Sequence, residues 1–120
     1  MDQLELEVIN ILRELEIPAH VKGYQYIKSA AKYLHGKTDS IYHITKELYP
    51  ETGRMHGEDI VSRVERGIRH AIGLSRANDA TWYRVLGRTG PMPNGEFLAT
   101  LIESVKIKMA TDMALAVEKV

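Results

Sequence analysis

Apolar residues recur every three to four positions along most of the chain, the spacing that lines one face of an α-helix. The first apolar stripe runs through residues 4–15 and stops at Ile17-Pro18, because a proline disfavours helical geometry in the residue before it. A second stripe predicts a helix over about 22–35. We expect Gly36 to end this helix in a left-handed cap, a conformation that glycine adopts at little cost.

The middle of the chain predicts a third helix over about 40–49. Asp39 or Ser40 is the expected N-cap, because a short polar side chain can accept a hydrogen bond from the free backbone N–H groups of the first turn. Pro50 is expected to close this helix. The next residues, 51–57, include two glycines and predict a loop.

Three further helices are expected at about 58–76, at 80–86 and from Asn94 onward, with a glycine- and proline-rich loop over 87–95. No segment shows the alternation of a strand. We therefore predict an all-α fold, a compact six-helix domain that spans residues 1–120 as one unit. Its third and fourth helices form a helix-turn-helix variant without a β-wing. Their connection, of roughly eight residues, is longer than the three or four of the tight motif.

The composition narrows the classes of function. The chain of 120 residues has no cysteine, and its five histidines never stand four positions apart, so no metal site is expected. No nucleophile motif occurs, and the loop over 87–95 lacks the Gly-Lys-Ser/Thr ending that holds a phosphate. We expect neither an enzyme nor a bound cofactor. No apolar run approaches the roughly 18–20 residues of a membrane span, and we expect a cytoplasmic, nucleoid-associated protein without membrane contact.

The formal net charge of zero conceals a separation along the chain. Residues 1–19 carry one base and five acids, whereas residues 20–76 carry ten bases and six acids. Residues 77–120 are balanced, with five of each. A neutral total argues against indiscriminate binding of polyanions, but the middle block can still present a local basic face.

The helix expected over 58–76 separates apolar from basic residues around its circumference. One arc collects the apolar residues Ile60, Val61, Val64, Ile68, Ala71 and Ile72. The opposite arc carries Ser62, Arg63, Arg66, Arg69 and His70, with Glu65 at its edge. A guanidinium fits O6 and N7 of guanine, or a phosphate, in paired hydrogen bonds, and a glutamate can accept from the cytosine amino group. A helix whose apolar face packs on the core, and whose opposite face presents these groups to solvent, fits the major groove of duplex DNA.

Two other interpretations of this face stay open from the residues alone. The first is a solvated helix surface with ion pairs, Asp59 with Arg63 and Glu65 with Arg69. The second is a helical protein-interaction module that docks its arginine face on an acidic protein partner.

Four stretches of the chain share a further likeness: residues 17–24 (IPAHVKGY), 44–50 (ITKELYP), 62–72 (SRVERGIRHAI) and 94–97 (NGEF). Together they resemble the C-terminal DNA-binding effector domain of the stage-zero sporulation protein A response regulator family. The similarity extends over about residues 6–109.

The resemblance implies a six-helix fold that binds double-stranded DNA at boxes of the TGTCGAA type, as head-to-tail pairs. It also implies activation or repression of transcription at entry into sporulation, within a two-component system. By position, it implies that Glu65 and Arg66 read bases. The family residues at or near the DNA correspond to Ser62, Arg63, Arg69 and His70. From charge and placement alone, Lys46 and Arg54 are predicted to contact the phosphate backbone.

The chain also departs from the family's pattern. Full-length members carry an N-terminal phosphoacceptor receiver domain, so we expect either an excised effector domain with an added Met1 or a receiverless relative. Residues 74–92 correspond to a segment that helps contact RNA polymerase sigma factor in the family, and they are fewer here. The partners that the resemblance implies are therefore DNA, a second copy in tandem on DNA, and a sigma factor. Residues 111–120 extend beyond the family's usual end.

Overall fold

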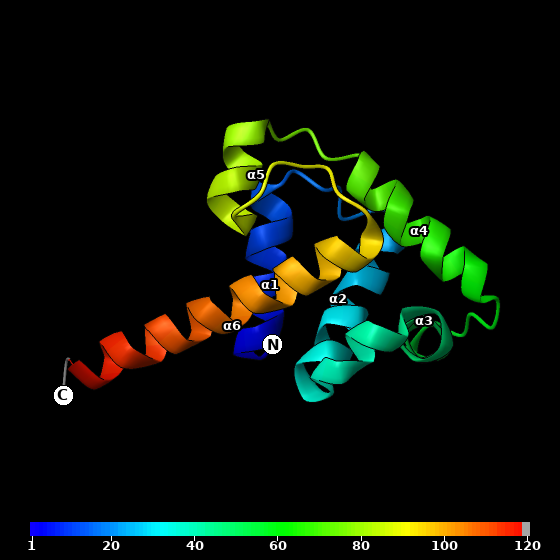
Figure 1. Cartoon of the computed structure of the whole chain (residues 1–120), viewed down its shortest axis with the longest axis horizontal. Coiled ribbons are helices and arrows are strands. Elements are labelled where there is room, and N and C mark those ends of the chain that lie inside the picture. Colours follow the sequence, from blue (N-terminus) through cyan, green and yellow to red (C-terminus); the bar gives the residue numbers. More distant parts are fainter. Residues whose placement is uncertain (119–120) are drawn as a thin grey trace.

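The computed structural model of the chain describes residues 1–118 and is helical throughout its regular structure (Figure 1). The six α-helices are α1 (Gln3–Glu14), α2 (Lys22–Gly36), α3 (Tyr49–Met55), α4 (Val61–Gly73), α5 (Asp79–Leu86) and α6 (Asn94–Glu118). Between α2 and α3 the chain forms a 3₁₀ turn, η1 (Thr38–His43), and a π turn, η2 (Ile44–Leu48). Because no strand occurs within residues 1–118, the predicted all-α, six-helix fold is confirmed.

α2 is the central helix, packed against α1, α3, α4 and α6. α6 crosses the molecule beside α1 and α2, and its C-terminal half extends away from the other helices (Figure 1). The large fully buried side chains come from every α-helix except α3, and they include Leu12, Ile27, Ile68, Trp82 and Phe97. None of the described helices is both long and apolar enough to cross a bilayer.

Two helix ends differ from the sequence expectation. Gly36 is the last residue of α2 and keeps a negative φ, so the predicted left-handed cap at this position is wrong. The left-handed cap is found instead at Gly87, with φ of 77°, whose N–H donates to the carbonyl of Tyr83 at 2.7 Å and closes α5. After α1 the left-handed position is Glu16, with φ of 54°, directly before Ile17-Pro18.

The third helix also lies elsewhere than predicted. Residues 38–48 form the two irregular turns, and α3 begins at Tyr49, with Pro50 in its first turn. Proline is tolerated there because the first-turn N–H groups of a helix have no partner inside the helix. Pro50 therefore starts a helix rather than closing one, and most of the loop predicted over 51–57 is helical. Neither Asp39 nor Ser40 acts as an N-cap.

The irregular segment before α3 is tied to α2 through one carboxylate. Glu47 accepts a hydrogen bond from the Tyr33 hydroxyl at 2.9 Å and pairs with the Lys37 ammonium at 2.9 Å. The hydrogen bond from Lys37, followed by that from Tyr33, lowers the pKa of Glu47 below its usual value. These contacts hold residues 44–48 beside the C-terminal end of α2.

α2 and α4 cross at Gly23 and Gly67. A Cβ atom on Gly23 would lie 1.9 Å from the carbonyl oxygen of Gly67 and 2.8 Å from Cβ of Ala71. A Cβ atom on Gly67 would lie 3.1 Å from the ring of Tyr26. The two backbones thus approach too closely for any side chain at Gly23. This contact anchors α4 by its inner face.

We predict that Gly23→Ala destabilises the protein by about 1–3 kcal/mol or more, because its methyl group must push α4 away from α2. Gly36→Ala is the matched control on the same helix, since nothing lies within 4 Å of the added methyl group. We expect this control to be neutral or to stabilise by up to about 1 kcal/mol. Urea denaturation of both variants measures the difference, and equal free energies of unfolding would contradict the role given to the crossing.

Candidate nucleic-acid interface

α3 and α4 form a helix-turn-helix pair joined by residues 56–60. The backbone N–H groups of His56 and Glu58 donate to the carbonyl of Gly53 at 2.9 and 2.8 Å, and Gly57 is left-handed with φ of 69°. A Cβ atom on Gly53 would lie only 2.4 Å from the carbonyl oxygen of Glu58, so the turn folds tightly back on α3. The connection is shorter than the predicted eight residues because α3 continues to Met55.

The inner face of α4 is held in the apolar core. Val64, Ile68, Ala71 and Ile72 are buried, as the helical spacing predicts. Ile60, however, precedes the helix as its N-cap residue and is 41% exposed, so its assignment to the core is wrong. The helix itself runs over Val61–Gly73 rather than over 58–76.

The outer face of α4 is open to solvent, and α4 lies at the edge of the molecule in Figure 1. The side chains of Arg63 and Arg69 are 59% and 63% exposed. The residues predicted for the outer arc are all exposed: Ser62, Arg63, Arg66, Arg69 and His70. A basic surface therefore stands outside the packed body, where a large ligand can reach it.

Two of the three arginines on this face already have acidic neighbours. Arg69 forms an ion pair with Glu65 one turn earlier, as the sequence spacing predicts. Arg63 lies 3.8 Å from Glu58, rather than pairing with Asp59 as expected. Among residues 1–118, no carboxylate lies within ion-pair distance of Arg66, whose Nε donates to the carbonyl of Ser62 at 3.3 Å. The face thus keeps one guanidinium with donors free of acidic partners.

Glu65 stands at the border of the open face. Its side chain is 33% exposed, and its backbone carbonyl accepts a hydrogen bond from Nδ2 of Asn94 at 2.9 Å. The same amide donates to the hydroxyl of Tyr49 at 3.1 Å. Burial raises the pKa of Tyr49, so this phenol stays neutral near pH 7. Sequence reasoning assigned no role to Asn94, although it begins the NGEF stretch at the start of α6.

The two predicted phosphate contacts lie on the elements that precede α4. Lys46 is exposed in η2, and Arg54 is exposed in α3. The Arg54 guanidinium donates from Nε and Nη2 to one carboxylate oxygen of Glu51, at 3.1 and 2.8 Å. The structure therefore places basic side chains on all three consecutive elements, η2, α3 and α4.

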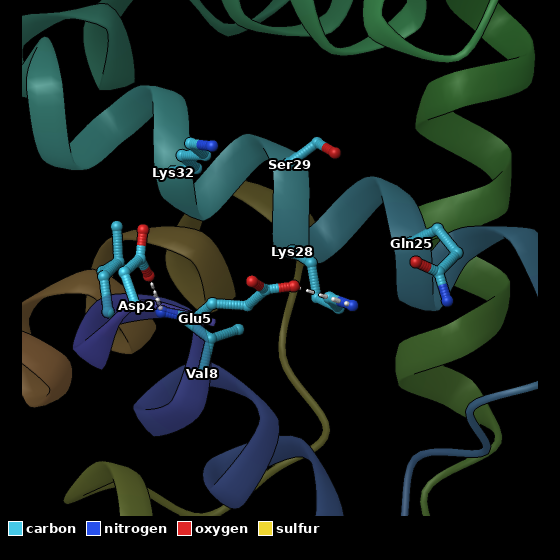
Figure 2. A pocket seen from close by; sticks show the side chains of 8 residues that line it. Asp2, Glu5, Val8, Gln25, Lys28, Ser29 and Lys32 are labelled. Carbon is cyan, nitrogen blue, oxygen red and sulfur yellow. Dashed lines mark hydrogen bonds and ion pairs between the residues drawn. The ribbon is translucent and has the colours of Figure 1, made fainter.

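The cavity between α1 and α2 offers no competing site (Figure 2). Its volume of about 200 Å³ is below the usual range for small-molecule pockets. Figure 2 shows Lys28 paired with Glu5 and Asp2 capping the first turn of α1, so these three of its charged side chains are already engaged. Within residues 1–118, no group of three or more His, Asp or Glu side chains could hold a metal ion.

We predict that Arg69→Ala changes the free energy of unfolding by less than about 1 kcal/mol, because an ion pair at an exposed helix surface contributes little. Thermal or urea denaturation measures this change. Lys108→Ala is a matched control, since it removes another exposed i,i+4 ion pair, that with Asp112 on α6. A loss of several kcal/mol for Arg69→Ala alone would mean that the basic face serves the fold.

The chain is similar to a known protein family. The family model described as "Sporulation initiation factor Spo0A C terminal" matches residues 8–105 of the chain. The matched segment begins within α1, contains α2 to α5 entirely, and ends within α6. It therefore includes the whole helix-turn-helix pair and Asn94.

Proposed function

Because the chain belongs to the family of C-terminal domains of the sporulation initiation factor Spo0A, we propose that it recognises specific duplex sequences with α4 in the major groove. Membership of this family makes the chain a DNA-binding regulator domain of sporulation transcription, and the family is not one of enzymes.

The open arginine face on a rigidly held helix carries this proposal. Val64 and Ile68 are fully buried on the opposite side of α4, and Gly67 allows α4 to pack closely against α2. The major groove of B-DNA is about 12 Å wide and admits an α-helix. A helix anchored in this way can bring its outer side chains to base edges without first losing conformational freedom.

Arg66 is the proposed reader of a guanine, through paired hydrogen bonds to O6 and N7. Its guanidinium has no acidic partner among residues 1–118 and so needs no ion pair broken before it binds. Glu65 is the proposed acceptor for the amino group of an adjacent cytosine. The adjacent C and G in the middle of a TGTCGAA-type box match this pair of readers.

The surrounding residues are proposed to hold the sugar-phosphate backbone. Arg63 and Arg69 can exchange their glutamate partners, Glu58 and Glu65, for phosphate oxygens, because exposed ion pairs are weak. Ser62 and His70 are exposed on the same face of α4. Lys46 and Arg54 are proposed to reach phosphates from η2 and α3.

The arrangement of copies and the protein partner are proposed from the family resemblance. We propose that residues 1–120 act as one effector unit, and that two copies bind adjacent boxes head to tail as a tandem homodimer. The segment that contains α5 is the proposed contact for RNA polymerase sigma factor.

Selection of bound duplexes from a random pool tests the proposal without assuming a target. We expect enrichment of one short box that contains an adjacent C and G. Binding to that box and to a scrambled duplex is then compared over a salt series. The affinity for both should fall steeply with salt, while the preference for the box remains. Indifference to sequence at every salt would instead favour a module that docks on an acidic protein.

We predict that Arg66→Ala weakens binding to the selected box by about 1–3 kcal/mol and relaxes the preference at one base pair. Arg84→Ala is the control, because it removes an arginine from α5, which packs on α1 and α6 rather than on α4. Competition binding with single-base variants of the box measures the change. Equal losses on the box and on a scrambled duplex would make Arg66 a phosphate contact.

A further inference from the structure

The start of α6 contacts both helices of the helix-turn-helix pair, α3 and α4. Asn94, its first residue, is 9% exposed. Its Nδ2 donates to the hydroxyl of Tyr49, the first residue of α3, at 3.1 Å. It also donates to the backbone carbonyl of Glu65, in the middle of α4, at 2.9 Å. One amide group therefore joins three helices that are distant in sequence.

The hydrogen bond to α4 is made at the turn that carries the proposed base readers. Its acceptor is the carbonyl of Glu65, and the next residue is Arg66. A carbonyl oxygen has two lone pairs, so it can accept from Asn94 and still take part in the helical hydrogen bonding of α4. The contact thus restrains the position and rotation of α4 at this turn without weakening the helix.

Neighbouring contacts make this restraint rigid. A Cβ atom on Gly95 would lie 3.0 Å from Cδ1 of Ile44, so the first turn of α6 also sits closely against η2. Tyr49, whose hydroxyl accepts the other hydrogen bond, is only 5% exposed. Oδ1 of Asn94 is buried and has no hydrogen-bond partner among residues 1–118. A buried, unpaired acceptor is unfavourable for stability, which points to the two N–H donors as the reason for an amide here.

We infer that Asn94 is a positioning residue for DNA recognition. Its amide fixes α4 against α3 at the helical turn from which Glu65 and Arg66 read bases. This inference rests on the proposed function. Asn94 itself is buried beneath α4 and touches no base. Loss of the Asn94 amide should therefore reduce the discrimination between duplexes more than it weakens binding to phosphates. Phosphate binding depends less on an exact helix position.

The test compares the ratio of affinities for the selected box and for a scrambled duplex. Asn94→Asp keeps the shape but has no N–H donors, and it places a carboxylate against the carbonyl of Glu65. Asn94→Ala removes the same donors without burying a charge. For both variants we expect the ratio to fall about tenfold, while the affinity of Asn94→Ala for the scrambled duplex stays within about twofold.

Asn78→Asp is the matched control. Asn78 caps α5 by accepting a hydrogen bond from the N–H of Thr81 at 2.9 Å, and an aspartate accepts the same bond. This control adds the same charge at another helix start, so its ratio should equal that of the unchanged protein. Urea denaturation first establishes that each variant is folded under the binding conditions. If neither Asn94 variant folds, the amide belongs to the fold rather than to recognition, and the inference is wrong.

A double-mutant cycle separates this inference from the proposed function. If Asn94 acts through the base readers, Asn94→Ala should lower the ratio less once Arg66→Ala is present, because only Glu65 then remains to be positioned. A ratio that falls with Arg66→Ala but not with either Asn94 variant would overturn the inference and leave the proposed function intact. A ratio unchanged by Arg66→Ala would refute the base-reading role itself, and with it the premise of the inference.

Discussion

The backbones of α2 and α4 cross at Gly23 with no room for even a methyl group, since the carbonyl oxygen of Gly67 would lie 1.9 Å from it. Such a close approach buries the inner face of α4 and leaves its outer face as the edge of the molecule (Figure 1). The turn at Gly53 and the amide of Asn94 restrain the same helix through further contacts. α4 is thus held at Glu65, at Gly67 and by the turn that precedes it, so its arginines can reach a ligand by side-chain motion alone.

The basic face shows why net charge is a poor guide to a binding surface. The formal charge of the whole chain is zero, yet α4 presents Arg63, Arg66 and Arg69 together. Two of these have glutamate neighbours, which compensate the repulsion between like charges while the surface is free. Because exposed ion pairs are weak, phosphates can replace those glutamates at small cost. A neutral chain can in this way remain compatible with a polyanion.

Discrimination between duplexes requires a more exactly positioned helix than affinity for DNA does. A phosphate contact tolerates a shift of the helix, because charge interactions vary slowly with distance. Paired hydrogen bonds to a base edge do not tolerate such a shift. The contacts of α4 with its neighbours are accordingly directional as well as apolar. The hydrogen bonds of Asn94 to Tyr49 and to Glu65 relate α3, α4 and α6 to one another, a task that the apolar packing of Val64 and Ile68 performs less specifically.

Periodicity in the sequence determined the all-α class, the approximate bounds of α1, α2, α5 and the start of α6, and the separation of apolar from basic residues around α4. These features are local, because a helix repeats every 3.6 residues whatever it packs against. Only the tertiary structure decided that Pro50 begins α3, that Gly87 rather than Gly36 is the left-handed cap, and that Ile60 lies outside the core. It also decided that Asn94 binds α3 and α4, whose acceptors stand 45 and 29 residues away in the chain. A proline or glycine permits more than one local conformation and an amide more than one partner, so long-range packing makes the choice.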